Sequence, residues 1–350
     1  MKRTISVVTM TLAAGALTAL AATTSKPDPE MKAVLDALGT LGGKPIETLS
    51  PEEARKQPTP ADAVMTLLKQ QGKSTAPEAV GNVENRTIPG PAGQIPIRIY
   101  TPQGSGPFPV VFYIHGGGWV IANLDTYDGS ARALTNAAQA IVISTHYRQA
   151  PEHKYPAAHD DVFAAYRWTL QNVQSLKGDP ARVAVAGESA GGNMAAVVSI
   201  RARDQKVTAP VHQLLVYPVA GTDMDTESYR ENATAKPLNK PMMTWFARHY
   251  LGDAAMKGNP EINLATRKDL KGLPATTIVT ADIDPLRSEG QMLAKALQDA
   301  GVAVTSRNFE GSAHEFFGMG AVVPDAKEAV AFAAAELKKA FASRKSGSAG

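Results

Sequence analysis

The sequence predicts an α/β fold with a mostly parallel central sheet and helices on both of its faces. Apolar, strand-like segments recur at residues 95–100, 108–114, 140–145, 183–186, 213–219, 275–280 and 302–308. The segment 108–114 is apolar almost throughout, which is typical of a strand buried on both faces of a sheet. Helix-compatible segments lie between most of these strands, near 126–139, 157–174, 190–204, 287–300 and 325–342. Strands that alternate with helices along the chain usually become parallel neighbours in one sheet. The pattern therefore predicts a layered α/β domain.

The segments outside this alternation are also predicted to be helical. Met31, Val34 and Leu38 recur at helical spacing, and Ser50-Pro51 is a typical helix start. A long insertion follows the strand at 213–219 and contains Met242, Trp245 and Phe246. Apolar residues at such spacing usually pack in a core, and a helix that covers a site is the alternative.

Composition excludes several classes of protein. The chain has 350 residues, 44% hydrophobic and 20% charged, a balance typical of globular proteins. It has no cysteine, which excludes disulfides, a thiolate nucleophile and cysteine metal ligands. No basic run interleaves with aromatic residues, so we expect no nucleic acid partner.

The N-terminus predicts export. Met1-Lys2-Arg3, an apolar stretch over 5–20 and Ala19-Leu20-Ala21 form the pattern of a secretory signal peptide over residues 1–21. A membrane anchor is the alternative, but the stretch is short and rich in threonine for a span. We therefore expect a periplasmic or secreted protein with no stable membrane span after cleavage. Removing Lys2 and Arg3 lowers the formal charge from +3 to +1, since 34 basic residues then face 33 acidic ones.

A candidate nucleophile lies where a strand passes into a helix. The strand at 183–186 is followed by Gly187-Glu188-Ser189-Ala190-Gly191 and then by a helix-compatible run. This is the context of the G-x-S-x-G nucleophile elbow, in which glycines leave room for a strained serine. The spacing alone is a weak signal, and a glycine-rich turn without chemistry is the alternative.

A glycine loop follows the strand at 108–114. His115-Gly116-Gly117-Gly118-Trp119 would leave backbone N–H groups free to approach a ligand, as an acyl oxyanion requires. A phosphate loop is the alternative, but no Lys-Ser or Lys-Thr follows the glycines.

A serine nucleophile needs a base and a group that orients it. His314 follows the last strand in a loop of small residues, and Asp282 and Asp284 follow the strand before it. The carboxyl ends of parallel strands meet at one sheet edge, so these residues should converge with Ser189. The order of the residues leaves the choice between the two aspartates open. A metal site at His146, His153 and His159 with Asp160 and Asp161 matches no familiar ligand spacing. We expect no metal and no cofactor.

The chain resembles the hormone-sensitive-lipase family of α/β-hydrolases, over about residues 85–320. The matching motifs include His115-Gly116-Gly117-Gly118, the segments 147–153 and 155–158, the segment 187–193, Asp284-Pro285-Leu286-Arg287 and His314-Glu315-Phe316. The resemblance implies an α/β-hydrolase catalytic domain over 82–343, with a cap insertion at about 222–265 and an N-terminal helical cap segment over 22–81. The C-terminal sequence itself predicts a disordered tail at 344–350. Two residues depart from the family's pattern: Glu188 replaces a frequent aspartate, and Ser288 replaces an acid.

The roles of the site residues follow from the resemblance. It implies Ser189 as nucleophile, His314 as base and Asp284, rather than Asp282, as the orienting acid. It also implies oxyanion donors at the N–H groups of Gly117, Gly118 and Ala190. The expected substrate-binding residues are Trp119, Trp245 and Phe246.

The sequence thus predicts a serine carboxylesterase that hydrolyses small esters with short acyl chains, as a monomer or homodimer. The triad serves acyl transfer in general, so a serine amidase or peptidase is the first alternative. A non-catalytic binder on the same fold is the second, and the intact triad argues against it.

Overall fold

The computed structural model describes residues 25–252 and 258–345. The proposed signal peptide lies outside these residues, as does most of the expected C-terminal tail. The central sheet has eight strands in the order β1-β2-β4-β3-β5-β6-β7-β8. In chain order the strands are β1 (Asn82–Gly90), β2 (Gly93–Thr101), β3 (Phe108–Ile114), β4 (Ile141–Thr145), β5 (Gly178–Glu188), β6 (Gln213–Val216), β7 (Thr276–Ile283) and β8 (Val304–Ala313).

Six of the strands are parallel, and two at one edge are not. β3 pairs in parallel with both β4 and β5, and parallel pairing continues through β6, β7 and β8. β2 is antiparallel to both β1 and β4. The predicted mostly parallel sheet is confirmed. The strand β1 was not predicted from the sequence.

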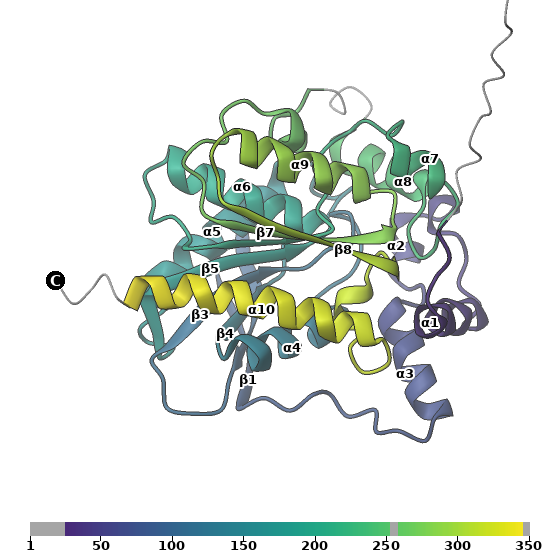
Figure 1. Cartoon of the computed structure of the whole chain (residues 1–350), viewed down its shortest axis with the longest axis horizontal. Coiled ribbons are helices and arrows are strands. Elements are labelled where there is room, and N and C mark those ends of the chain that lie inside the picture. Colours follow the sequence, from purple (N-terminus) through teal and green to yellow (C-terminus); the bar gives the residue numbers. More distant parts are fainter. Residues whose placement is uncertain (1–24, 253–257, 346–350) are drawn as a thin grey trace, which may run out of the picture.

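Helices cover both faces of the sheet (Figure 1). The strand β3 shows how the two cores arise, because its side chains alternate between them. Val110, Phe112 and Ile114 pack in the core under α5 (Ala157–Asn172), α6 (Ala190–Asp204) and α9 (Arg287–Asp299). Val111 and Tyr113 pack in the core under α4 (Asp128–Ala138) and α10 (Pro324–Lys345).

The remaining helices gather at one end of the sheet. They are α1 (Pro29–Thr40), η1 (Ile46–Thr48), α2 (Pro51–Ala54), α3 (Pro60–Gln70), α7 (Glu227–Glu231) and α8 (Lys240–Leu251), with η2 (Leu264–Thr266) and η3 (Phe316–Gly318) as further single turns. Figure 1 shows α1, α2, α7 and α8 at the end to which the arrows of β7 and β8 point. Ligands of parallel sheets bind at this carboxyl edge.

Two capping boxes define the starts of N-terminal helices. The Ser50 hydroxyl accepts from the N–H of Glu53, whose carboxylate accepts in turn from the N–H of Ser50. Thr59 and Asp62 repeat this arrangement at α3. Each box satisfies two backbone donors at a helix end.

No helix among the described residues is both long and apolar enough to span a membrane.

Candidate active site

The turn between β5 and α6 holds Ser189 in a strained conformation. Its φ is 56° and its ψ −119°, a region that non-glycine residues rarely adopt. The flanking glycines permit this turn by their lack of a side chain. A Cβ on Gly187 would lie 2.2 Å from the carbonyl oxygen of Gly191, and a Cβ on Gly191 would lie 2.1 Å from that of Ile114. The predicted elbow therefore has a steric basis in the packing of β3, β5 and α6.

Three side chains from three loops form a continuous hydrogen-bonded line. The Nε2 atom of His314 lies 3.0 Å from Oγ of Ser189. Its Nδ1 atom lies 2.7 Å from Oδ2 of Asp284. Because an ionised carboxylate only accepts, Nδ1 carries the proton, which leaves Nε2 free to accept from the serine hydroxyl. All three side chains are almost fully buried.

The structure separates the two aspartates that the sequence left open. Oδ1 of Asp284 accepts from the N–H of Leu286 at 2.8 Å, which fixes the carboxylate that faces His314. Asp282 instead pairs with Arg287 at 2.7 Å. The contact with the imidazole therefore belongs to Asp284.

The surroundings of His314 favour its protonated form. Burial alone would lower its pKa, but the charge and hydrogen bond of Asp284, with the charges of Glu315 and Glu188, raise it overall. The ring of Tyr217 packs against the imidazole with centroids 4.5 Å apart. An imidazolium formed during proton transfer would be stabilised in this setting.

A cavity of about 530 Å³ opens above these side chains. Ser189, His314, Gly117 and Gly118 line it, so the glycine loop and the hydroxyl share one space. Ala190 is the first residue of α6, where a backbone N–H has no acceptor within the helix. Of the residues predicted to supply oxyanion donors, Gly117 and Gly118 therefore share the cavity with Ser189, and Ala190 directly follows the serine.

Both the N-terminal helices and α8 contribute walls to this cavity. Leu35 and Leu38 come from α1, and Met242, Met243 and Phe246 come from α8. The resemblance implies a cap segment over residues 22–81, but helical spacing alone does not show that Leu35 and Leu38 are the side chains that face the cavity.

The three predicted substrate-binding residues differ in their placement. Phe246 and Trp119 line the cavity. Trp119 is buried and stacks on Tyr250 of α8, with ring centroids 4.7 Å apart. Trp245 is not among the lining residues: its Nε1 donates to the carbonyl of Leu49, and its ring packs edge-on against Phe246. Trp245 therefore supports the cavity wall from behind.

The histidine of the glycine loop holds that loop in place. Nδ1 of His115 contacts the carbonyl of Gly116 at 2.9 Å, and Nε2 contacts Nδ1 of His146 at the same distance. A carbonyl only accepts, so His115 donates through Nδ1 and accepts from His146. Burial lowers the pKa of His115 to about 3, which keeps this ring neutral. The Tyr147 hydroxyl donates to the Gly116 carbonyl at 2.8 Å.

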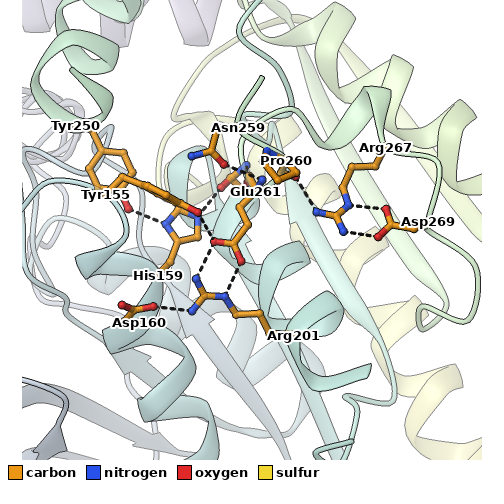
Figure 2. Close-up of polar contacts among 11 residues, drawn as sticks. Tyr155, His159, Asp160, Arg201, Tyr250, Asn259, Pro260, Glu261, Arg267 and Asp269 are labelled. Atoms are coloured by element: carbon orange, nitrogen blue, oxygen red, sulfur yellow. Dashed lines mark hydrogen bonds and ion pairs between the residues drawn. The ribbon is translucent and has the colours of Figure 1, made fainter. Parts of the chain in front are cut away.

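A polar network supports the elbow on the side of α5 and α6 (Figure 2). Glu261 accepts from both Arg201 and Tyr155, and Arg201 also pairs with Asp160. The His159 ring lies between the Tyr250 hydroxyl at 2.6 Å and Oδ1 of Asn193 at 3.1 Å.

The hydrogen bonds of Asn193 fix the state of His159. The Asn193 amide nitrogen donates to the carbonyls of Val219 and Glu261, so its oxygen must accept from Nε2 of His159. Nδ1 then accepts from Tyr250. Burial lowers the pKa of His159 to about 4, consistent with a neutral ring. The imidazole therefore connects α8 to the residue four positions after the serine.

The three histidines considered for a metal do not converge. His146 contacts His115, His159 contacts Tyr250 and Asn193, and His153 is exposed. Within the described ranges, no group of His, Cys, Asp or Glu side chains is placed to hold a metal ion.

The two departures from the family pattern both have partners. Glu188 lies under the site and accepts from the hydroxyls of Tyr113 and Tyr217. Burial and the charge of Glu315 raise its pKa to about 7, against the hydrogen bonds of the tyrosines. Ser288 accepts from the N–H of Ser228, whose hydroxyl accepts from the N–H of Ser288. This reciprocal pair joins α7 to α9.

Known proteins share this fold and much of the sequence. A family model described as alpha/beta hydrolase fold matches residues 111–318. The carboxylesterase NlhH of Mycobacterium tuberculosis is 42% identical over 292 residues, which cover 81% of this chain and 91% of that protein. An arylesterase of Saccharolobus solfataricus is 34% identical over 249 residues, 70% of this chain and 80% of that protein. The crystal structure of a thermostable esterase from Pseudomonas putida superposes with a TM-score of 0.82 at 33% identity, covering 92% of this chain and 99% of that one.

Proposed function

The chain belongs to the hormone-sensitive-lipase family of α/β-hydrolases and is a carboxylic ester hydrolase, and we propose that it cleaves short-acyl esters through Ser189, His314 and Asp284. The observation that supports this most strongly is the unbroken hydrogen-bonded line from Ser189 to Asp284, at 3.0 and 2.7 Å. This line reaches a cavity that the glycine loop also lines.

In the proposed mechanism, Nε2 of His314 takes the proton of Ser189 as Oγ attacks the ester carbonyl. Asp284 keeps the imidazole in the required tautomer and stabilises the imidazolium. The N–H groups of Gly117, Gly118 and Ala190 stabilise the oxyanion, each contributing about 3 to 4 kcal/mol by comparison with other oxyanion holes. The imidazolium then returns its proton to the departing alcohol, which leaves an acyl-enzyme.

Water completes the cycle in the proposed second half-reaction. His314 activates a water molecule that attacks the acyl-enzyme, and the same amides stabilise the second oxyanion. The second intermediate breaks its bond to Oγ of Ser189, which takes the proton back from His314, and the acyl group is released as a carboxylic acid. Every step uses groups that line the cavity or touch a group that does.

The covering of the cavity supports a preference for short acyl chains. Its volume is about 530 Å³, and Phe246, Met242 and Met243 of α8 form part of its walls. In this proposal, α8 and the N-terminal helices act as a cap that limits the length of the acyl chain.

Initial rates on nitrophenyl esters from acetate to palmitate test both points, with the Ser189→Ala variant alongside. We expect rates that peak at short chains and vanish in the variant. Undiminished hydrolysis by folded Ser189→Ala would refute the nucleophile. Faster hydrolysis of palmitate than of butyrate would refute the short-acyl preference.

We further propose that residues 1–21 direct export. Their basic start, apolar stretch and Ala19-Leu20-Ala21 site support this. N-terminal sequencing of protein recovered outside the cytoplasm should begin near residue 22. An intact Met1 on all active protein would contradict the proposal.

A further inference from the structure

A second carboxylate, that of Glu315, lies beside the imidazole of His314. Its Oε1 atom is 3.9 Å from Nε2 of His314, the nitrogen that also contacts Ser189. The Tyr127 hydroxyl donates to the same Oε1 at 2.5 Å and so fixes its position. Glu315 lines the cavity, and its side chain remains 21% exposed. The charge is therefore part of the cavity wall, next to the reacting atoms.

The backbone holds Glu315 in a conformation that would suit glycine. Its φ is 71°, in the left-handed region, where a side chain brings strain. Strained residues of this kind cluster at functional sites because the surroundings must maintain them. Here the hydrogen bond from Tyr127 and the contact with His314 are the interactions that the strained residue makes.

Proton transfer in the proposed mechanism brings the substrate's alcohol part close to this carboxylate. Nε2 of His314 must reach the oxygen of the departing alcohol within a hydrogen bond. Since Glu315 Oε1 is 3.9 Å from Nε2, substituents near that oxygen lie within a few ångströms of the negative charge. At such distances in a partly dehydrated cavity, unit charges interact strongly.

The other charged side chains that line the cavity differ from Glu315 in their exposure or in their ion pairs. Lys44 and Lys236 also line it, but both are exposed, and solvent screens their charges. Arg55 is paired with Glu152 at 2.7 Å. Glu47 is half-buried on the η1 turn. Glu315 differs from these groups because its carboxylate lies 3.9 Å from Nε2 of His314.

The ionisable groups that surround Glu315 have opposing effects on its charge. Burial raises the pKa of Glu315, and the charge of Asp284, between β7 and α9, acts in the same direction. The charge of His314 and the hydrogen bond from Tyr127, just before α4, oppose this. Glu188, at the end of β5, is a further acidic group that interacts with Glu315 through its charge, and it accepts hydrogen bonds from Tyr113 and Tyr217. The imidazolium formed in the reaction favours the ionised form of Glu315 when the alcohol departs.

We propose that Glu315 makes the enzyme selective for esters whose alcohol part carries a positively charged ammonium group. This inference rests on the proposed function, because it places the alcohol at Nε2 of His314. An uncharged alcohol of the same shape gains nothing from the carboxylate, and an anionic one is repelled.

Two acetate esters of matched shape test the selectivity. One is the acetate of choline; in the other, a tert-butyl group replaces the trimethylammonium group of the alcohol. We expect wild-type kcat/KM to be about tenfold higher for the cationic ester, the factor that about 1.4 kcal/mol of attraction produces. Glu315→Gln should bring the ratio close to one. Glu310→Gln, which removes an exposed carboxylate from β8, should leave the wild-type ratio unchanged.

A second variant protects the test against misfolding. Glu315→Gly also removes the charge, and glycine is unstrained at this φ, so this variant should fold and lose the selectivity too. A direct electrostatic role also predicts a shift in pH dependence. Without the Glu315 charge the pKa of His314 should fall, so the acid limb of the kcat/KM profile for the neutral ester should move to lower pH.

The outcomes separate this inference from the proposed function. A ratio that stays at the wild-type value in both Glu315 variants, or a wild-type ratio at or below one, overturns the inference and leaves the esterase intact. Loss of selectivity without movement of the acid limb overturns the electrostatic coupling to His314. Absence of hydrolysis of the neutral ester by folded wild-type protein overturns the proposed function itself.

Discussion

The buried carboxylate of Glu188 should make the stability of the protein depend on pH. Burial and the charge of Glu315 raise its pKa from 4.5 to about 7, although Tyr113 and Tyr217 donate hydrogen bonds to it. A carboxyl group whose pKa is raised by folding stabilises the folded state at low pH. That contribution is complete below about pH 4.5 and is lost as the pH rises through 7.

The size of the effect follows from the shift. An increase of about 2.5 units, at about 1.4 kcal/mol per unit, corresponds to about 3 kcal/mol in the free energy of unfolding. Most of this change falls between about pH 5 and pH 8. The variant Glu188→Gln has no proton to lose there, so its stability should fall less over that interval.

Urea denaturation of wild type and Glu188→Gln across this interval measures the difference directly. We expect the stability of wild type relative to the variant to fall by about 2 to 3 kcal/mol from pH 5 to pH 8. A loss of hydrogen bonds in the variant would shift its stability equally at each pH, so the slope is the informative quantity. Glu310→Gln controls for the loss of one acidic residue, since Glu310 is exposed. If the stability of wild type minus that of Glu188→Gln stays constant or rises from pH 5 to pH 8, the reasoning is refuted.

Further variants test the geometry of the site at three positions, Asp284, Gly118 and His159. Asp284→Asn should lower kcat about a thousandfold or more, as loss of the orienting carboxylate does elsewhere, while Asp282→Asn should keep the triad contacts and most of the activity. Gly118→Ala would place a Cβ 2.3 Å from the Phe246 ring at a φ of 58°, so we expect a large loss of kcat that Phe246→Ala partly restores. His159→Leu removes the bridge from Tyr250 to Asn193 and should lower kcat more than it raises KM. Steady-state kinetics on a short nitrophenyl ester tests each variant, with circular dichroism as a check on folding. Activity equal to wild type in Asp284→Asn, Gly118→Ala or His159→Leu would contradict the contact assigned to that residue, as would a loss in Asp282→Asn as large as that in Asp284→Asn.

The central part of the fold could be predicted because its sequence pattern is unambiguous. β3 is apolar along nearly its whole length, and the Gly-x-Ser-x-Gly turn marks the passage from β5 to α6. The edge strand β1 could not be predicted in the same way. Only Ile88 is buried in it, and Pro89 interrupts the strand-like composition, so its position depends on pairing with β2.

The candidate site was predictable to the level of its motifs but not of its walls. Sequence order placed Ser189 and His314 together and left Asp282 and Asp284 undecided, because both lie at the carboxyl end of β7, Asp282 within the strand and Asp284 directly after it. The backbone turn at Pro285 distinguishes the two aspartates, because it lets the N–H of Leu286 donate to the carboxylate of Asp284. For α8, apolar residues occupy more than one face, so the sequence could not show that Phe246 faces the cavity and Trp245 faces Leu49.

The role of His159 could not be read from the sequence either. Its partners Tyr250 and Asn193 are distant along the chain, and only the packing of α5, α6 and α8 brings the three together. The same holds for Glu315, whose partner Tyr127 precedes α4. Contacts of this kind depend on tertiary packing and leave no periodic signal.

The most direct measurement for the proposed mechanism is the intact mass of the protein after reaction with an activated phosphonate ester, which mimics the tetrahedral intermediate. We predict one phosphonyl adduct per chain, located on Ser189, together with loss of esterase activity. Ser189→Ala should gain no mass. An adduct on another residue, or full esterase activity in protein that carries the Ser189 adduct, would contradict the assignment of Ser189 as the nucleophile.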